Sequence, residues 1–186
     1  MEAALATVRE KGFAGTTARA IAQHGGFNQS LIFYHFGSVP DLVLEAFSRD
    51  SVAQLARHRD AAAATSSLSD LVVVARRLHT ENLERGSVKA VTQLTAAAAS
   101  DPDLGRAILD AFEDWIALVQ DTLSRVAVSH SLAGTVPARQ VAYAISAMFL
   151  GIELITRLDP ERSEAEAVFD VMADVARLIE ARSSGF

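Results

Sequence analysis

The chain contains no cysteine among its 186 residues, which excludes disulfide bonds and cysteine-ligated metal sites. Aromatic residues are also scarce, at 6%, whereas hydrophobic residues make up 50% of the chain. Such a chain can bury a sizeable core, and its many alanines favour closely packed helices over a β-rich fold. Because cysteine is absent, we expect the protein to work in a reducing cytoplasm.

We also expect no signal peptide, because Glu2, Arg9 and Glu10 place charges within the first dozen residues. The longest apolar run, about Val141–Ile152, ends at Glu153. That run is shorter than the roughly 20 residues that a transmembrane helix needs. We therefore expect no membrane association.

The formal net charge is −6, which by itself argues weakly against nucleic-acid binding. Its distribution is uneven, because the first forty residues carry Arg9, Lys11 and Arg19 against Glu2 and Glu10. This segment has a net charge of +1, which leaves −7 for the rest of the chain. A DNA-binding unit joined to an acidic domain has this pattern, but so do many ordinary acidic proteins.

The hydrophobic spacing is helical along the whole chain, and no segment alternates as a strand does. Gly12 and Gly37 are placed to end helices, and Thr17, Asn28 and Asp101 are placed to cap helix starts. We therefore predict an all-α protein. It has about nine helices, near residues 1–11, 18–24, 29–36, 39–64, 70–85, 88–99, 102–128, 137–158 and 164–179.

Two short helices joined by the Gly25–Gly26 turn form a helix-turn-helix centred on residues 17–36. The second helix begins with polar residues, and the DNA major groove admits such a helix with its N-terminal end facing the bases. Gln29 can pair with an adenine edge, and Leu31 can contact a thymine methyl group. The helix start at Thr17 can hold a phosphate. The candidate DNA-contacting residues are Thr17, Arg19, Asn28, Gln29, Ser30, Leu31, Tyr34 and His35.

Large apolar residues of the same segment are more simply explained as the core of a small three-helix unit than as site residues. Without further information, a structural helical hairpin with no DNA role also fits this spacing. The predicted core residues are Phe13, Ile21, Ala22, Phe27, Ile32 and Phe36.

The run from Gly12 to Ser38 resembles the N-terminal helix-turn-helix of the TetR family of transcriptional regulators. The Gly-Phe after the first helix, the Thr-Thr cap, the Ile-Ala pair and the aromatic-His-Phe end occur in order at fixed spacing. The motif covers about 27 residues, and the rest of the chain matches only in architecture. The resemblance implies a DNA-binding domain at residues 1–45 and a helical effector-binding and dimerisation domain at residues 46–186.

The resemblance further implies a homodimer that pairs through its last two helices and binds a near-palindromic operator in double-stranded DNA. It implies repression that an unknown small-molecule effector relieves. Two positions depart from the family pattern, because Phe33 stands where tyrosine is frequent and Val39 where lysine is common. Each departure removes a phosphate contact, so we expect weaker DNA binding and a flatter salt dependence.

Residues of the middle helices are candidates for an apolar effector cavity, although ordinary core is the simpler explanation for any single one of them. Polar side chains on or near the same faces could orient a ligand. The candidate ligand-binding residues are Leu78, His79, Gln93, Phe112, Trp115 and Met148.

No metal-ligand spacing, nucleophile elbow or glycine-rich phosphate loop is present, so we expect neither a metal, a cofactor nor an enzyme. Two alternatives remain. The chain could be an interaction module that kept the fold but lost DNA binding, as the changes at Phe33 and Val39 would allow. An α-helical enzyme is the other.

Overall fold

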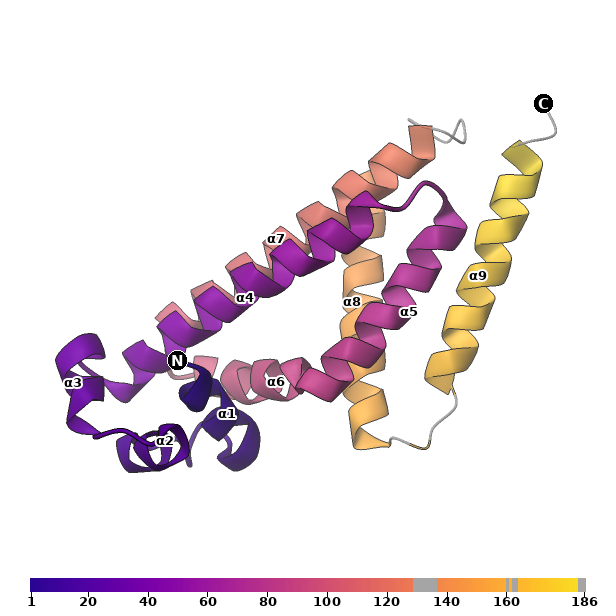
Figure 1. The fold of residues 1–186 in the computed structure, drawn as a ribbon. Coiled ribbons are helices and arrows are strands. Elements are labelled where there is room, and N and C mark those ends of the chain that lie inside the picture. The colour runs from indigo at the N-terminus through magenta and orange to yellow at the C-terminus, as the bar shows by residue number, and fades with distance from the viewer. Residues whose placement is uncertain (129–136, 160, 162–163, 184–186) are drawn as a thin grey trace. The chain divides into compact units, whose positions relative to one another are not determined.

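The computed structural model describes residues 1–128, 137–159, 161 and 164–183, and within these residues it contains helices and no strand (Figure 1). The all-α prediction is confirmed. The helices are α1 (Glu2–Lys11), α2 (Ala18–Gly25), α3 (Ser30–Phe36), α4 (Val39–Ala63), α5 (Leu68–Arg85), α6 (Ser87–Ala98), α7 (Pro102–Val128), α8 (Ala138–Leu158) and α9 (Glu164–Ser183).

Helix ends fall where the start and stop residues predicted them. Gly12 and Gly37 follow α1 and α3 with φ of 72° and 78°, a backbone region that residues with a side chain rarely adopt. At the start of α7, Asp101 Oδ1 accepts hydrogen bonds from the amides of Asp103 and Leu104, both at 3.1 Å. The loop expected at residues 129–136 lies outside the described residues.

The chain forms two compact units, and α4 and α7 contribute residues to both. The first unit comprises Met1–Gln54 and Gly86–Phe112, and the second comprises Leu55–Arg85 and Glu113–Phe186. Helix α6 and the start of α7 thus pack with the N-terminal helices. The functional division at residue 45 is a separate question and stays a prediction.

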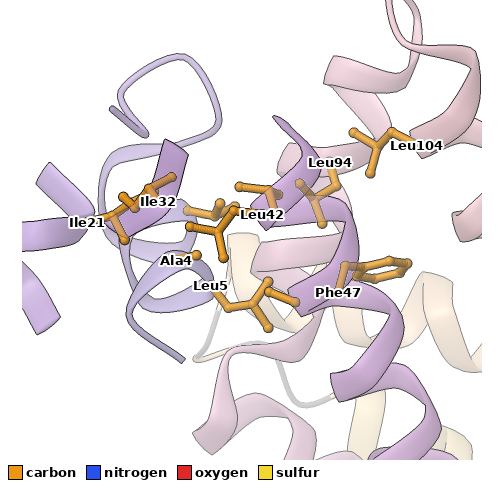
Figure 2. Packing of buried hydrophobic residues seen from close by; sticks show 11 residues of the cluster. Ala4, Leu5, Ile21, Ile32, Leu42, Phe47, Leu94 and Leu104 are labelled. Atoms are coloured by element: carbon orange, nitrogen blue, oxygen red, sulfur yellow. The ribbon is translucent and has the colours of Figure 1, made fainter. Parts of the chain in front are cut away.

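The core of the first unit draws aliphatic side chains from every helix that enters it. Leu5 of α1, Ile21 of α2 and Ile32 of α3 are at most 5% exposed, and Leu42 and Leu94 join them from α4 and α6 (Figure 2). Burying side chains of this size stabilises a fold by about 1.5–3 kcal/mol each. This packing fixes α2 and α3, which form the helix-turn-helix.

Helix α5 packs against both α8 and α9 in the second unit (Figure 1). Near the start of α5, the Ser69 amide and hydroxyl donate to the Glu180 carboxylate at 2.9 and 2.7 Å. About two helical turns further along α5, Arg76 pairs with Asp170 of α9 at 2.5 Å. Polar contacts therefore fix α9 to α5 at two levels.

Helix α8 is long and apolar enough, by length and composition alone, to cross a membrane. The apolar run predicted to be too short is thus part of a 21-residue helix. One such helix is weak evidence for a membrane span, because core helices pass the same test. Here only 22% of its most apolar window is buried, and the buried residues include Glu153.

Candidate nucleic-acid interface and ligand cavity

Helix α2 starts at the threonine pair that the sequence marks as a cap. The hydroxyl of Thr17 accepts a hydrogen bond from the Ala20 amide at 3.2 Å, and Thr17 itself has extended backbone geometry. Thr16 is buried, and its hydroxyl donates to the Gly12 carbonyl at 2.7 Å. The two threonines therefore differ in role, and the exposed Thr17 lies at the helix start.

The turn between α2 and α3 is formed by Gly26 in the left-handed conformation, with φ of 68°. Phe27 follows it, and the prediction that Phe27 belongs to the core is wrong, because this residue is 36% exposed. Its ring lies over Gly25, where a Cβ atom would come within 2.2 Å of Phe27 Cε1. The ring covers the turn instead of entering the core.

Helix α3 is held at its start by Asn28. The Asn28 side-chain oxygen accepts hydrogen bonds from the amide and the hydroxyl of Ser30, both at 2.9 Å. Gln29 already has helical backbone geometry, and its side chain makes no capping bond. Asn28 thus positions the helix, which leaves the exposed Gln29 amide available for a base edge.

All eight predicted DNA-contacting residues are exposed. Arg19, Asn28 and Gln29 line one shallow surface depression, together with Gln23, which the sequence interpretation missed. Gln23 lies four residues after Arg19, one helical turn along α2, and this spacing could have identified it. Tyr34 is the most exposed of the large residues on α3, at 83%, and its ring packs edge-on against His35.

The two positions that depart from the family pattern, Phe33 and Val39, lie near the end of α3 and at the start of α4. Phe33 is 53% exposed, so it offers an apolar surface where a tyrosine would add a hydroxyl group. Val39 is partly buried and packs against the core of the first unit. The valine therefore strengthens packing at the start of α4, where a lysine would extend a charge.

The second unit contains an apolar cavity of about 340 Å³, lined by residues of α4, α5, α7, α8 and α9. This volume lies within the range of about 300–1,000 Å³ that is common for small-molecule sites. Aliphatic side chains form most of its wall. Trp115 and Phe149 add two aromatic rings whose centroids are 5.8 Å apart.

Two of the six predicted ligand-binding residues, Leu78 and Trp115, line this cavity. His79 is buried beside it, with its ring edge against Phe149 at 6.2 Å, and Met148 is 37% exposed on α8. Neither is a lining residue. The remaining two, Gln93 and Phe112, belong to the first unit.

His58 of α4 lines the cavity and was not anticipated from the sequence. It is 7% exposed, and its ring contacts Trp115 edge-on at 5.0 Å. Burial, assisted by the nearby charge of Arg57, lowers its pKa from 6.5 to about 4, so the ring is neutral at pH 7. Residues 58, 62 and 65 are all buried, which is a helical spacing, but the sequence around His58 is mostly polar and does not mark this face.

A second buried polar group lies between α5 and α8. The Asn82 side-chain amide donates to Glu153 Oε1 at 2.7 Å, and Glu153 is only 4% exposed. Burial raises the pKa of Glu153 to about 7, although the Asn82 hydrogen bond opposes this shift. Burial also lowers the pKa of His79. The part of the chain that the structure describes holds no group of three or more acidic or histidine residues suited to a metal.

Solved structures of transcriptional regulators share this fold. A regulator assigned to the TetR family from Mesorhizobium loti is 24% identical and has a TM-score of 0.77, with 97% of this chain and 91% of that chain covered. FadR from Bacillus subtilis, solved with stearoyl-CoA, is 13% identical with a TM-score of 0.77 and 94% of each chain covered. A protein from Saccharomonospora viridis, assigned as a transcriptional regulator and solved with choline, is 20% identical with a TM-score of 0.77 and 93% and 91% coverage.

Two family models match the sequence, while a search of curated proteins finds no match. Residues 1–46 match the model of bacterial regulatory proteins of the tetR family. Residues 71–180 match the C-terminal model of BetI-type transcriptional repressors, and this match covers more than half of the chain. Together with the capped helix-turn-helix and the helical second unit, these matches show that the chain belongs to the TetR family of transcriptional regulators.

Proposed function

We propose that this TetR-family chain is a homodimeric, cytoplasmic repressor whose affinity for its operator falls when a small molecule occupies the cavity of the second unit. The observation that carries the proposal is the exposed polar face at the start of α3. Asn28 holds the backbone there, and Gln29 and Arg19 line one depression beside it. Side chains on a rigid, capped helix are suited to contact bases in the major groove.

Residues 1–45 are the proposed DNA-binding domain, and residues 46–186 the proposed effector-binding and dimerisation domain. Base contacts come from Gln29, Ser30 and Leu31, because these begin the recognition helix. Phosphate contacts come from the start of α2 and from the far end of α3. The proposed phosphate-contacting residues are Thr17, Arg19, Tyr34 and His35.

The proposed dimer pairs α8 and α9 with their symmetry mates in a four-helix arrangement. Both helices expose large apolar side chains, and exposed apolar patches of this kind mark interaction sites. A membrane is the less suitable cover, because a lone α8 in a bilayer would expose Glu153 to lipid. The exposed residues are Tyr143, Met148, Leu154, Ile155 and Leu158 on α8 and Val171, Val175 and Leu178 on α9.

Effector binding releases the operator if the ligand prefers a conformation in which the two recognition helices are wrongly spaced for that DNA site. Helix α4 supports this coupling, because it contributes Leu42 to the core beneath the helix-turn-helix and His58 to the cavity wall. The solved relatives that hold stearoyl-CoA or choline support small-molecule binding in general.

The test is selection of bound sequences from a random duplex DNA pool with wild-type protein and with a Gln29→Ala, Arg19→Ala double variant. We expect the wild type to enrich a near-palindrome with half-sites about one helical turn apart, and the double variant to enrich none. Binding to random duplex is measured in parallel at two salt concentrations. Absence of binding at low salt would contradict the proposal and favour an interaction module that lost DNA binding.

A further inference from the structure

The described residues that line the cavity of the second unit include no charged side chain. None of them is an aspartate, glutamate, lysine or arginine. Two lining residues are polar, and one of them, Thr122, donates its hydroxyl to the Leu118 carbonyl at 2.7 Å. An ionised ligand group would lose its hydration here and find no opposite charge, which is strongly unfavourable.

The other polar lining residue, His58, has hydrogen-bonding capacity that the protein leaves unused. None of the hydrogen bonds found among the described residues involves its ring nitrogens. The residue is nonetheless only 7% exposed, and its ring is fixed by the edge-on contact with Trp115. The ring nitrogens are not among the fully enclosed side-chain atoms that lack a partner, so they keep accessible surface, and a ligand that hydrogen-bonds to them gains affinity.

Charged residues near His58 lie outside the cavity wall. The electrostatic neighbours are Arg57 and Arg85, which disfavour a charged imidazole, and Glu81, which favours it. Burial outweighs all three, so the ring is neutral over the physiological pH range. A neutral imidazole can donate from one nitrogen and accept at the other, which suits a hydroxyl, carbonyl or amide group of a ligand.

We propose that the effector is an uncharged, mostly hydrocarbon molecule with one hydrogen-bonding group that meets the imidazole of His58. This inference rests on the proposed function, because it takes the cavity as the effector site. The aliphatic wall and the rings of Trp115 and Phe149 bind the hydrocarbon part. His58 fixes the orientation and selects against pure hydrocarbon.

Three probes of equal chain length test the charge preference directly: 1-decanol, kept below its solubility limit, and decanoate and decyltrimethylammonium, each kept below its micelle concentration. Trp115 is the sole tryptophan of the chain and lines the cavity, so its fluorescence reports occupancy without a label. With the wild-type chain at pH 7.5, we expect saturable binding of decanol at one molecule per chain. Decanoate and decyltrimethylammonium should bind at least about tenfold more weakly because their charges must be desolvated.

Variants at His58 test the polar contact. We expect His58→Leu to weaken decanol binding by about three- to tenfold, the value of one hydrogen bond. His58→Gln, which keeps a hydrogen-bonding group, should restore most of the affinity. The matched control is His24→Leu, which removes an exposed histidine of the first unit and should leave binding unchanged. Circular dichroism establishes that each variant is folded.

The proposal is overturned if either ionic probe binds as tightly as decanol, or if His58→Leu binds decanol like the wild type. The comparison of probes on the wild type stands even if a variant fails to fold. These outcomes differ from failure of the proposed function, in which a probe occupies the cavity but leaves operator affinity unchanged in a parallel DNA-binding titration.

Discussion

The two units are packed in different ways. In the first unit, buried side chains such as Ile21 and Ile32 form a continuous core, which fixes α2 and α3 against the rest of the unit. In the second, the buried cluster around Phe149 and Phe169 borders a cavity of about 340 Å³. Tightly packed interiors resist deformation, whereas a void leaves side chains room to move. A rigid face is suited to recognising DNA, and an adaptable interior is suited to admitting a ligand.

The largest expected effect contrasts one core residue from each unit. Ile21→Ala removes a fully buried side chain and should lower the free energy of unfolding by about 2–5 kcal/mol. Leu71→Ala, at the cavity wall, should cost less than about 2 kcal/mol, because that side chain already lacks neighbours on one side. Urea denaturation followed by circular dichroism measures both. Equal costs would mean that the cavity closes in solution.

The pH dependence of stability provides the next test, through Glu153. Its pKa is raised from 4.5 to about 7, so the folded state binds more protons than the unfolded state between these values. The Glu153 contribution therefore becomes less favourable as the pH rises through this window. We expect Glu153→Gln to raise the free energy of unfolding by about 3 kcal/mol at pH 8 and to have little effect near pH 4.5.

His58 makes the opposite contribution, because its pKa is lowered from 6.5 to about 4 and stability is lost as the pH falls through that range. The two contributions oppose each other where the windows overlap. The Glu153→Gln variant should therefore show a clear loss of stability on acidification, measured by urea denaturation at a series of pH values. If Glu153→Gln raised the free energy of unfolding equally at every pH, the pKa of Glu153 would not be shifted, and its carboxyl group would be hydrated in the folded protein.

A smaller effect is expected at the DNA face. Gln29→Ala should cost about 1–3 kcal/mol of binding free energy on a cognate site and relax the preference at one base pair. Gln140→Ala, an exposed glutamine of the second unit, is the control and should change neither. Fluorescence anisotropy with single-base variants of the site provides the measurement. If the base preference survives Gln29→Ala, our placement of α3 in the groove is wrong.

The smallest effect concerns Arg19. If Arg19 contacts a phosphate, its replacement by alanine should weaken binding to all DNA sequences alike. The slope of the logarithm of the binding constant against the logarithm of the salt concentration should fall in magnitude by about 1. Titrations of cognate and random duplex at several salt concentrations measure this slope. A loss confined to the cognate site would instead place Arg19 on a base.

Helix boundaries were predictable from the sequence because they depend on neighbouring residues. Gly12, Thr17 and Asp101 each act within a turn of their own position, and each ends or caps the predicted helix. Whether a given side chain is buried or exposed was less predictable. Phe27 has the residue type of a core position, but Gly25, two residues before it, leaves room for its ring at the surface.

The cavity wall was only partly accessible to sequence reasoning. Leu78 and Trp115 were identified because they lie on apolar helical stripes. His58 lies in a mostly polar stretch of α4, and its role depends on Trp115, which is far away in the sequence. The position of Gln93 likewise depends on a residue far away in the sequence. Helix α6 packs against α1, and the Gln93 side chain fills the space beside Gly12.

The contacts that hold α9 against α5 determine how this helix pair responds to salt. At its two levels, Ser69 with Glu180 and Arg76 with Asp170 are polar contacts, and between them lie apolar residues such as Val72 and Ala176. Sodium chloride screens the charges of the exposed Arg76 pair, whereas sulfate also strengthens apolar association. The seam between these helices should thus respond to the kind of salt as well as to its concentration.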